Sequence, residues 1–277
     1  MVPARPEIRE ASRTGGARVS LLELQRVGKI FGGLRAVNEV SFEVAKGSIF
    51  GLIGPNGAGK TTLFNVITGV YTPESGSILF AGKNIAGLKP AAIAARGVAR
   101  TFQNIRVFRT MTVEENVMVA GHHLHTATIA DAMFRTTRYE RDEGALRKRA
   151  RELLEILGLA ELARETAGSL PYGSQRRLEI ARALMLSPEL LLLDEPAAGM
   201  NSQEALTLNE QIRFLRDQLG LTVILVEHNM AVVMNVCEKI HVVDHGETIA
   251  EGTPAEIKTD AQVLAAYLGE EPKEAAG

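Results

Sequence analysis

A glycine-rich segment that follows a short apolar run limits the folds open to this chain more than any other feature. The apolar run covers residues 48–53, and it leads into Gly54-Pro55-Asn56-Gly57-Ala58-Gly59-Lys60-Thr61-Thr62. This segment matches the pattern G-x-x-x-x-G-K-[ST] in full, and a helical stretch follows from Thr61 to about Gly69. The order strand, loop, helix is the context in which this pattern forms a phosphate-binding loop. The alternative is a glycine-rich turn that binds nothing.

The residue types in this loop suit the chemistry of a nucleotide. Glycines allow the backbone to wrap so that successive N–H groups converge on phosphate oxygens. The helix that follows presents the positive end of its dipole to the same anion. We expect Lys60 to reach the β- and γ-phosphates and the hydroxyl of Thr61 to coordinate Mg²⁺. The loop therefore predicts a site for a nucleotide and its Mg²⁺ ion.

The composition excludes several classes of protein. The chain has 277 residues, of which 45% are hydrophobic and 23% charged, values typical of a soluble globular protein. Its formal net charge of −2 argues against a globally basic surface for nucleic acid. The single cysteine, Cys237, cannot form an internal disulfide and favours a reducing compartment. No apolar stretch approaches the roughly 18 residues that a membrane helix needs.

Strand and helix patterns on both sides of the middle of the chain indicate an α/β fold. Alternating apolar and polar side chains predict two hairpins, residues 20–26 with 40–44 and residues 77–80 with 83–85. The second half predicts a helix, a strand, a helix and a strand, at residues 176–186, 190–193, 203–219 and 221–226. Because these two strands are continuously apolar and lie between helices, we expect a parallel sheet that is covered on both faces.

The middle of the chain differs in character from its flanks. Residues 113–162 are rich in Ala, Leu, Glu and Arg, and apolar side chains recur at helical spacing between Leu146 and Leu157. Gly158 is expected to end that helix. The pattern predicts an all-helical insert. Residues 1–18 lack the apolar stretch of a secretory signal and are expected to form a floppy polar leader.

A second chemical signal lies at the end of the apolar run in the second half. Asp194 and Glu195 directly follow four leucines, so they are expected at the carboxyl end of a strand, where α/β sheets bind ligands. Asp194 suits Mg²⁺, which prefers oxygen ligands, and Glu195 could polarise the water that attacks a γ-phosphate. The alternative is a strand end that carries two solvated acids.

The order of these and three further elements resembles that of a known family. Gln103 lies between the phosphate loop and the helical insert, residues 170–177 read Leu-Pro-Tyr-Gly-Ser-Gln-Arg-Arg, and His228 follows the strand 222–226. Phosphate loop, glutamine, signature loop, Asp-Glu strand and histidine, in this order, resemble the nucleotide-binding subunit of an ATP-binding-cassette (ABC) transporter. The resemblance covers residues of about 20 to 270.

The resemblance implies a fold and a division of the chain. The expected fold class is a P-loop NTPase (RecA-like) α/β core with a parallel sheet, an N-terminal antiparallel β subdomain and an inserted α-helical subdomain. Residues 19–270 would form one nucleotide-binding domain, with the helical subdomain at about 113–175. Residues 1–18 and 271–277 would lie outside it as a disordered leader and a flexible tail.

The resemblance also implies a composite ATPase, in which two cassettes pair head to tail and bury two ATP molecules. One nucleotide would be served by Gly54 to Thr62, Gln103, Asp194, Glu195 and His228. The partner's nucleotide would be served by Tyr172, Gly173, Ser174 and Gln175. Within this set, Thr61, Gln103 and Asp194 would hold Mg²⁺, while Lys60, Gln103, Glu195 and His228 would act in hydrolysis.

Three positions leave alternatives open. Phe31 stands where the family has an aromatic residue that stacks on adenine, but it could also be an ordinary core residue. A lone histidine after a strand, such as His228, is more often structural. The family's signature usually reads Leu-Ser-Gly-Gly-Gln, whereas Pro171 here replaces the serine, so a serine contact is not expected and Gly173 keeps its backbone N–H. Asn201 similarly stands where an acidic residue is usual.

Several short segments resemble the ATPases of branched-chain amino acid importers: Leu170 to Arg182, Glu195 to Asn201, Val226 to Met230, and Ala266 to Glu270. Such a subunit would work on the cytoplasmic face of the inner membrane, with permease subunits, a second identical or similar cassette and an extracytoplasmic solute-binding protein, and without nucleic acid. Importers of urea or short amides and the lipopolysaccharide exporter share much of the pattern. A soluble cassette ATPase of DNA repair or translation is a further alternative.

Two clusters of side chains, one of histidines and one of arginines, are weaker indications of function. His122, His123 and His125 could suggest a metal site, but no Cys or acidic ligand lies at a standard spacing, which favours a solvated loop. Arg100, Arg106 and Arg109 form either a solvated face or a surface for a membrane partner.

Overall fold

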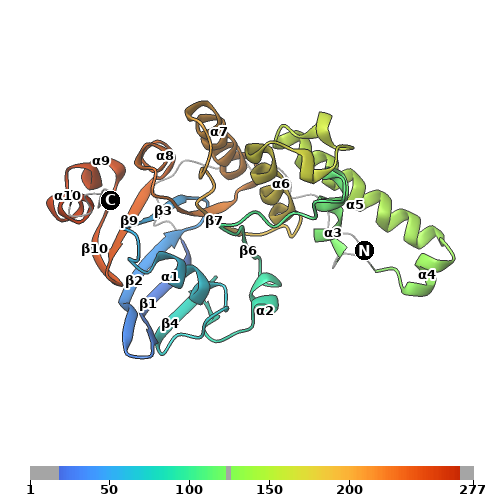
Figure 1. Ribbon diagram of the computed structural model, residues 1–277. Helices are drawn as coiled ribbons and strands as arrows, with labels where there is room; N and C mark the ends of the chain where they lie inside the picture. The colour runs from blue at the N-terminus through green and yellow to red at the C-terminus, as the bar shows by residue number, and fades with distance from the viewer. Residues whose placement is uncertain (1–18, 123–125, 269–277) are drawn as a thin grey trace, which may run out of the picture.

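Two β-sheets of different design organise the computed structural model, which describes residues 19–122 and 126–268 (Figure 1). The first is antiparallel, with the order β2-β1-β4-β5 and the strands β1 (Ser20–Phe31), β2 (Leu34–Ala45), β4 (Ser75–Phe80) and β5 (Lys83–Asn84). The second has the order β10-β9-β3-β8-β7-β6. Its strands are β3 (Ile49–Ile53), β6 (Val98–Arg100), β7 (Leu190–Asp194), β8 (Thr222–Val226), β9 (Lys239–Asp244) and β10 (Glu247–Gly252).

The six-stranded sheet is parallel except at one edge. Strands β3, β7 and β8 are buried at every residue, which explains their continuously apolar sequences. The edge strand β10 runs antiparallel to β9 and was not predicted. His245 and Gly246 join the two strands, with φ angles of 46° and 82°. Two consecutive positive φ angles are the geometry of a tight hairpin turn, so the chain reverses here without a crossover helix.

Ten α-helices and two short 3₁₀ turns are present in the described residues. The helices near the sheets are α1 (Lys60–Ile67), α2 (Pro90–Ala94), α7 (Ser202–Leu219), α8 (Met230–Val236), α9 (Pro254–Thr259) and α10 (Ala261–Leu268). The helical region between the two halves contains α3 (Val113–Ala120), α4 (Ile129–Met133), α5 (Thr137–Ile156), η2 (Ala160–Leu162), η3 (Ala167–Ser169) and α6 (Tyr172–Leu184). In Figure 1, α4 and the start of α5 extend away from both sheets.

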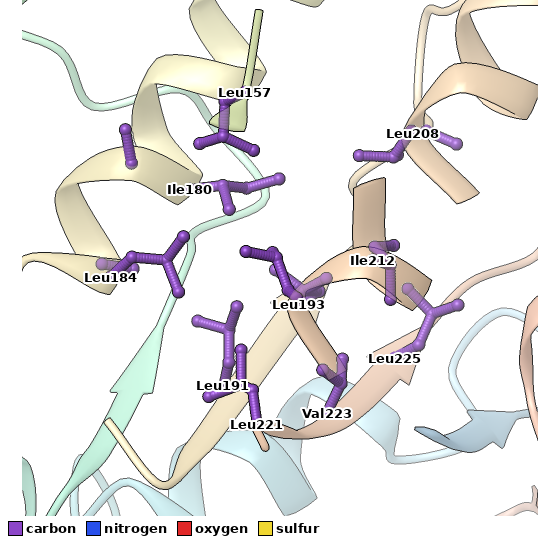
Figure 2. Packing of buried hydrophobic residues seen from close by; sticks show 14 of the residues in the cluster. Leu157, Ile180, Leu184, Leu191, Leu193, Leu208, Ile212, Leu221, Val223 and Leu225 are labelled. Atoms are coloured by element: carbon purple, nitrogen blue, oxygen red, sulfur yellow. The ribbon is translucent and has the colours of Figure 1, made fainter. Parts of the chain in front are cut away.

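Strand β7 belongs to two hydrophobic clusters at once. Leu191 and Leu193 pack with the helical region, where Figure 2 shows them beside Ile180 of α6 and Ile212 of α7. The alternate side chains, including Leu192, pack on the other face with the antiparallel sheet and α1. A strand that is packed on both faces has little freedom to move. The carboxyl end of β7 therefore gives the residues that follow it a rigid base.

The expected α/β class is confirmed, and most differences lie at the ends of elements. The first hairpin extends beyond residues 20–26 and 40–44 because β1 and β2 continue to a tight turn between Phe31 and Leu34. Helix α5 ends at Ile156, and Gly158 follows with a φ of +64°, as its role as a helix stop predicts. Within residues 19–122 and 126–268, no helix has the length and apolarity to cross a membrane.

Candidate functional site

The glycine-rich loop lies between the carboxyl end of β3 and the start of α1. Two of its glycines are required by the close approach of other backbone segments. A Cβ atom at Gly54 would lie 2.0 Å from the carbonyl oxygen of Val243, and one at Gly59 would lie 2.4 Å from that of Ala36. Both residues also have positive φ angles, 153° and 100°. Any side chain at either position would push the loop away from β9 or β2.

The loop forms one wall of a cleft of about 500 Å³. Lys60 is buried in it, and its Nζ donates hydrogen bonds to the carbonyl oxygens of Gly54 and Pro55 at 2.6 and 2.7 Å. Helix α1 begins at Lys60 with no side-chain cap and no acidic residue in its first turn. The cleft therefore combines a cation with the N-terminal end of a helix, which suits an anion. The lining residues predicted from the sequence are Phe31, Asn56, Gly57, Ala58, Gly59, Lys60, Thr61, Thr62, Gln103 and Glu195.

Three predicted residues from separate segments meet at one carboxylate. The side-chain amide of Gln103 donates to Oε2 of Glu195 at 3.1 Å, and Nδ1 of His228 lies 3.7 Å from Oε1. Glu195 has a φ of +47°, a left-handed conformation that costs a residue with a Cβ atom about 1–2 kcal/mol. Its N–H donates to the carbonyl oxygen of Val226 at 2.9 Å, so the end of β8 helps to hold this conformation.

Asp194 is buried and forms an ion pair with Arg100. Nη2 of Arg100 donates to Oδ2 of Asp194 at 2.7 Å, and Nη1 donates to the side-chain oxygen of Asn65 at 2.6 Å. The pair leaves Oδ1 of Asp194 outside the guanidinium contact. Arg100 was considered only as part of a basic patch, and its partner could not be found from the sequence because the contact depends on β6 lying beside β7.

The donor set near the cleft fits Mg²⁺ by its chemistry. Hard cations prefer oxygen ligands. The hydroxyl of Thr61 and the amide oxygen of Gln103, which line the cleft, are of that type, as is the carboxylate of Asp194, which does not line it. Among the residues that the structure describes, no group of three or more His, Cys, Asp and Glu side chains could hold a metal. His123 and His125 of the histidine cluster lie outside the described residues.

Phe31 lies at the rim of the cleft rather than in the core. Its side chain is 41% exposed, and its ring contacts that of Tyr71 edge-on, with 5.1 Å between centroids. Nζ of Lys29 lies 5.0 Å from the Phe31 centroid. The exposure argues against the core alternative and leaves part of the ring accessible to a flat ligand. Tyr71, which contacts this ring, was not identified from the sequence.

The signature residues lie away from the cleft of their own chain. Tyr172, Gly173, Ser174 and Gln175 form the first turn of α6, and none of them lines the cleft. Tyr172 is 45% exposed. The hydroxyl of Ser174 is buried and accepts a hydrogen bond from Arg177 at 3.0 Å, whereas the side chain of Gln175 donates to the carbonyl oxygen of Leu170 at 2.8 Å. Pro171 precedes the helix without a side-chain cap, so the N–H groups of Tyr172 and Gly173 have no intrahelical acceptor.

Asn201, one of the two departures from the family pattern, is the N-cap residue that directly precedes α7. Its side-chain oxygen accepts hydrogen bonds from the N–H groups of Gln203 and Glu204, both at 3.0 Å. The carboxylate of Glu204 in turn accepts a hydrogen bond from the N–H of Asn201 at 2.9 Å, which completes a capping box. Asparagine and aspartate cap helices equally well, so the substitution keeps the local structure.

Glu227, which directly precedes His228, was also missed. It is buried, and its Oε1 accepts a hydrogen bond from the N–H of Ala197 at 2.7 Å. Burial raises the pKa of its carboxyl above the ordinary value, against the opposing effect of the backbone donors. The signal in the sequence was an acid at the end of a fully apolar strand, a position where a charged group needs a specific partner.

Comparison with known proteins places this geometry among ATP-binding cassettes. A family model described as ABC transporter matches residues 37–198, and one described as branched-chain amino acid ATP-binding cassette transporter matches residues 247–273. The ADP conformation of an ATP-binding cassette of an ABC transporter has a TM-score of 0.80 and 33% identity, over 91% of this chain and 100% of that one.

Three curated relatives are similar over nearly their whole length. The high-affinity branched-chain amino acid transport ATP-binding protein LivG of Salmonella typhimurium is 47% identical over 87% of this chain and 94% of the relative. The protein of the same description named BraF, from Pseudomonas aeruginosa, is 46% identical over 90% and 98%. The lipopolysaccharide export system ATP-binding protein LptB of Escherichia coli is 36% identical over 91% and 99%.

Proposed function

Because this chain belongs to the ABC transporter family of ATP-binding cassettes, we propose that it hydrolyses ATP to drive uptake of branched-chain amino acids. The proposal of ATP hydrolysis rests mainly on one observation, which is that Lys60, Gln103 and Glu195 line the same cleft. The substrate class is supported by the family match at residues 247–273 and by the identity to LivG and BraF. The family and the fold make the chain an ATPase, and the roles of single residues are part of the proposal.

In the proposed mechanism the loop binds the phosphates of ATP. Lys60 exchanges its two carbonyl acceptors for phosphate oxygens, which replaces neutral hydrogen bonds with stronger charge-assisted ones. Thr61, Gln103 and Asp194 would hold Mg²⁺, which when bound neutralises charge that develops on the phosphates. Phe31 stacks on the adenine ring from the rim. Asp194 uses the oxygen that Arg100 does not contact.

Glu195 orients the water that attacks the γ-phosphate. Its carboxylate lies at the wall of the cleft, and Gln103 and His228 contact its two oxygens. We propose that Gln103 holds one oxygen while the other accepts a hydrogen bond from the water. His228, at the outer side of this carboxylate, donates to the γ-phosphate. Little covalent chemistry is required of the protein, so position and charge supply most of the rate enhancement.

The proposal includes a second cassette, because the signature residues do not reach the cleft of their own chain. The N–H groups of Tyr172 and Gly173 have no intrahelical acceptor at the start of a 13-residue helix, an arrangement that suits an anion. We propose that they complete the site of a partner cassette that packs head to tail. Permease subunits and an extracytoplasmic solute-binding protein would complete the complex, with this chain on the cytoplasmic face of the inner membrane. Residues 113–175 would form its helical subdomain.

Reconstitution tests both parts of the proposal. The assembled transporter is placed in proteoliposomes, and uptake of leucine, isoleucine and valine is measured together with ATP hydrolysis. We expect uptake that requires ATP and the solute-binding protein. Hydrolysis with uptake of urea or a short amide, or with release of lipopolysaccharide, would overturn the substrate class alone. A complex that binds ATP but does not hydrolyse it would overturn the proposed enzymatic role.

A further inference from the structure

The carboxylate of Glu227 links the two loops that carry Glu195 and His228. Glu227 follows β8 directly and is 1% exposed. Strand β8 pairs with β7, with Val226 opposite Asp194, and the pairing continues as the N–H of Glu195 donates to Val226. Glu195 and Glu227 therefore leave neighbouring strands at the same edge of the sheet.

Each oxygen of Glu227 accepts a hydrogen bond from a different loop. Oε1 accepts from the N–H of Ala197 at 2.7 Å, two residues after Glu195. Oε2 accepts from the N–H of Asn229 at 3.4 Å, one residue after His228. One side chain, fixed by burial, therefore holds the backbone on the far side of both residues.

The loop after Glu195 has few other means of support. Glu195 has a left-handed φ of +47°, and the next residue is Pro196, which has no N–H to donate. Ala197 therefore provides the first backbone donor beyond Glu195. The N–H of Ala198 closes the turn onto the carbonyl oxygen of Glu195 at 3.1 Å, but this bond lies within the loop and does not attach it to the sheet.

We propose that Glu227 is a positioning residue for ATP hydrolysis, which holds the carboxylate of Glu195 and the imidazole of His228 in register. The inference rests on the proposed function. Within the described residues, Glu227 forms hydrogen bonds only to these two loops and no salt bridge. The charged and titratable groups that interact with it are Glu195 and His228, from the two loops that it joins, and the buried thiol of Cys237. Both of its hydrogen bonds therefore attach to the loops that carry the hydrolytic residues.

Two substitutions separate hydrogen bonding from charge. Glu227→Gln removes the charge and keeps one acceptor oxygen at the same reach. That oxygen can keep the shorter bond from the N–H of Ala197, which joins the two loops, while the long bond from the N–H of Asn229 within its own loop is lost. Glu227→Asp keeps the charge but is one methylene shorter, so it cannot hold Ala197 and Asn229 together. If positioning is the role, we expect kcat to fall about 100-fold in Glu227→Asp, and Glu227→Gln to restore it to within about threefold of the parent. KM for ATP should change less than about twofold in both variants, because Glu227 does not line the cleft.

Thr222 at the opposite end of β8 provides a matched control. It is fully buried, and its hydroxyl accepts a hydrogen bond from the N–H of Gly47 at 2.9 Å. Thr222→Ala removes a buried acceptor from the same strand, away from the cleft. We expect it to lower thermal stability about as much as Glu227→Asp does, but to leave kcat unchanged. If Thr222→Ala lowers kcat as much as Glu227→Asp, the effect of Glu227 is general destabilisation and the proposal is wrong.

A double variant tests whether Glu227 acts through Glu195. Residues that act as a unit are not additive, so Glu195→Gln/Glu227→Asp should show the same residual turnover as Glu195→Gln alone. Additive losses would overturn the proposal, as would parental kcat in Glu227→Asp or a Glu227→Gln variant as slow as Glu227→Asp. A parent chain that binds ATP without hydrolysing it would overturn the proposed function itself, and this result is separate because it is read before any substitution.

Discussion

The cleft and the signature turn, which are proposed to meet on one ATP molecule, are built in opposite ways. The cleft collects residues from distant segments, such as Phe31, Gln103 and Glu195, and hollows the surface between the two sheets. The signature turn is one continuous stretch at the start of α6, and its side chains are tied to their own chain. The difference teaches that one chain presents a cleft suited to phosphate and, elsewhere, the start of a helix whose Gly173 lies beside the carboxylate of Glu204.

Glu195→Gln should cause the largest loss of turnover, and the substitution acts on the cleft alone. The substitution removes the carboxylate that orients water while it preserves size and the contact with Gln103. We expect kcat to fall by about 10²–10⁴, the range for loss of one catalytic acid–base group. ATP affinity, measured by titration calorimetry, should change little. Near-parental turnover would contradict the role of Glu195 and shift the water-orienting function to another group.

A mixing experiment tests whether the cleft of one chain works together with the signature turn of another. Lys60→Ala disables the cleft, whereas Gly173→Asp places a carboxylate near Glu204 and the incoming phosphate. Each variant alone should be inactive, with ATP affinity lost only in Lys60→Ala. In an equimolar mixture, random head-to-tail pairing leaves about a quarter of all sites with both halves intact. Recovery of about a quarter of parental turnover supports a composite site, whereas no recovery would mean that each chain works alone.

The cleft and the signature turn also differ in how far the sequence could predict them. The glycine-rich loop and the Asp194-Glu195 strand end follow local patterns whose residue types explain themselves chemically, and the structure places both as expected. The signature turn has no such local chemistry, because a proline, a tyrosine and a glycine before a helix fit many functions. It was predicted only from the order of the family's motifs.

Residues that were missed share a different physical cause. The pairing of Arg100 with Asp194 requires β6 to lie beside β7, and the contact of Tyr71 with Phe31 joins a loop to the first hairpin. Glu227 acquires its role from the backbone N–H of Ala197 across the sheet edge. Such partners are set by strand order and register, which residue spacing in one sequence does not specify.

Phe31→Ala should have a smaller effect than either change above, and again only on the cleft. An aromatic platform under a base is worth about 1–3 kcal/mol. The rim position and the 41% exposure of Phe31 place it at the lower end, so we expect Kd for ATP to rise about tenfold with kcat at saturation nearly unchanged. Phe31→Tyr is the matched control and should bind ATP as the parent does. Loss of kcat with normal affinity would show that Phe31 belongs to the hydrolytic part of the site.

The smallest effect should come from an ionic cluster around a buried histidine, which belongs to neither the cleft nor the signature turn. His241 of β9 is 1% exposed, and its Nδ1 lies 2.7 Å from Oε2 of Glu251, which also pairs with Lys239. The hydrogen bond from His241 is the main reason that the pKa of Glu251 lies below its ordinary value. A carboxyl with a lowered pKa stabilises the fold above its unfolded-state pKa, and this contribution is lost as the pH falls through the folded-state value.

Glu251→Gln should therefore lower the free energy of unfolding by about 1 kcal/mol at pH 7, after allowance for solvent screening at this half-buried group. The difference from the parent should begin to close as the pH falls below the ordinary value of 4.5, and it should vanish once the pH has passed below the lowered folded-state pKa, where the parent carboxyl is protonated as well. Urea unfolding followed by circular dichroism at several pH values measures this difference. ATP affinity and turnover of the folded protein should stay at parental values, because neither the cleft nor the signature turn includes Glu251. A loss of turnover without a loss of stability would mean that β9 and β10 transmit strain to the loop through Val243, which contacts Gly54.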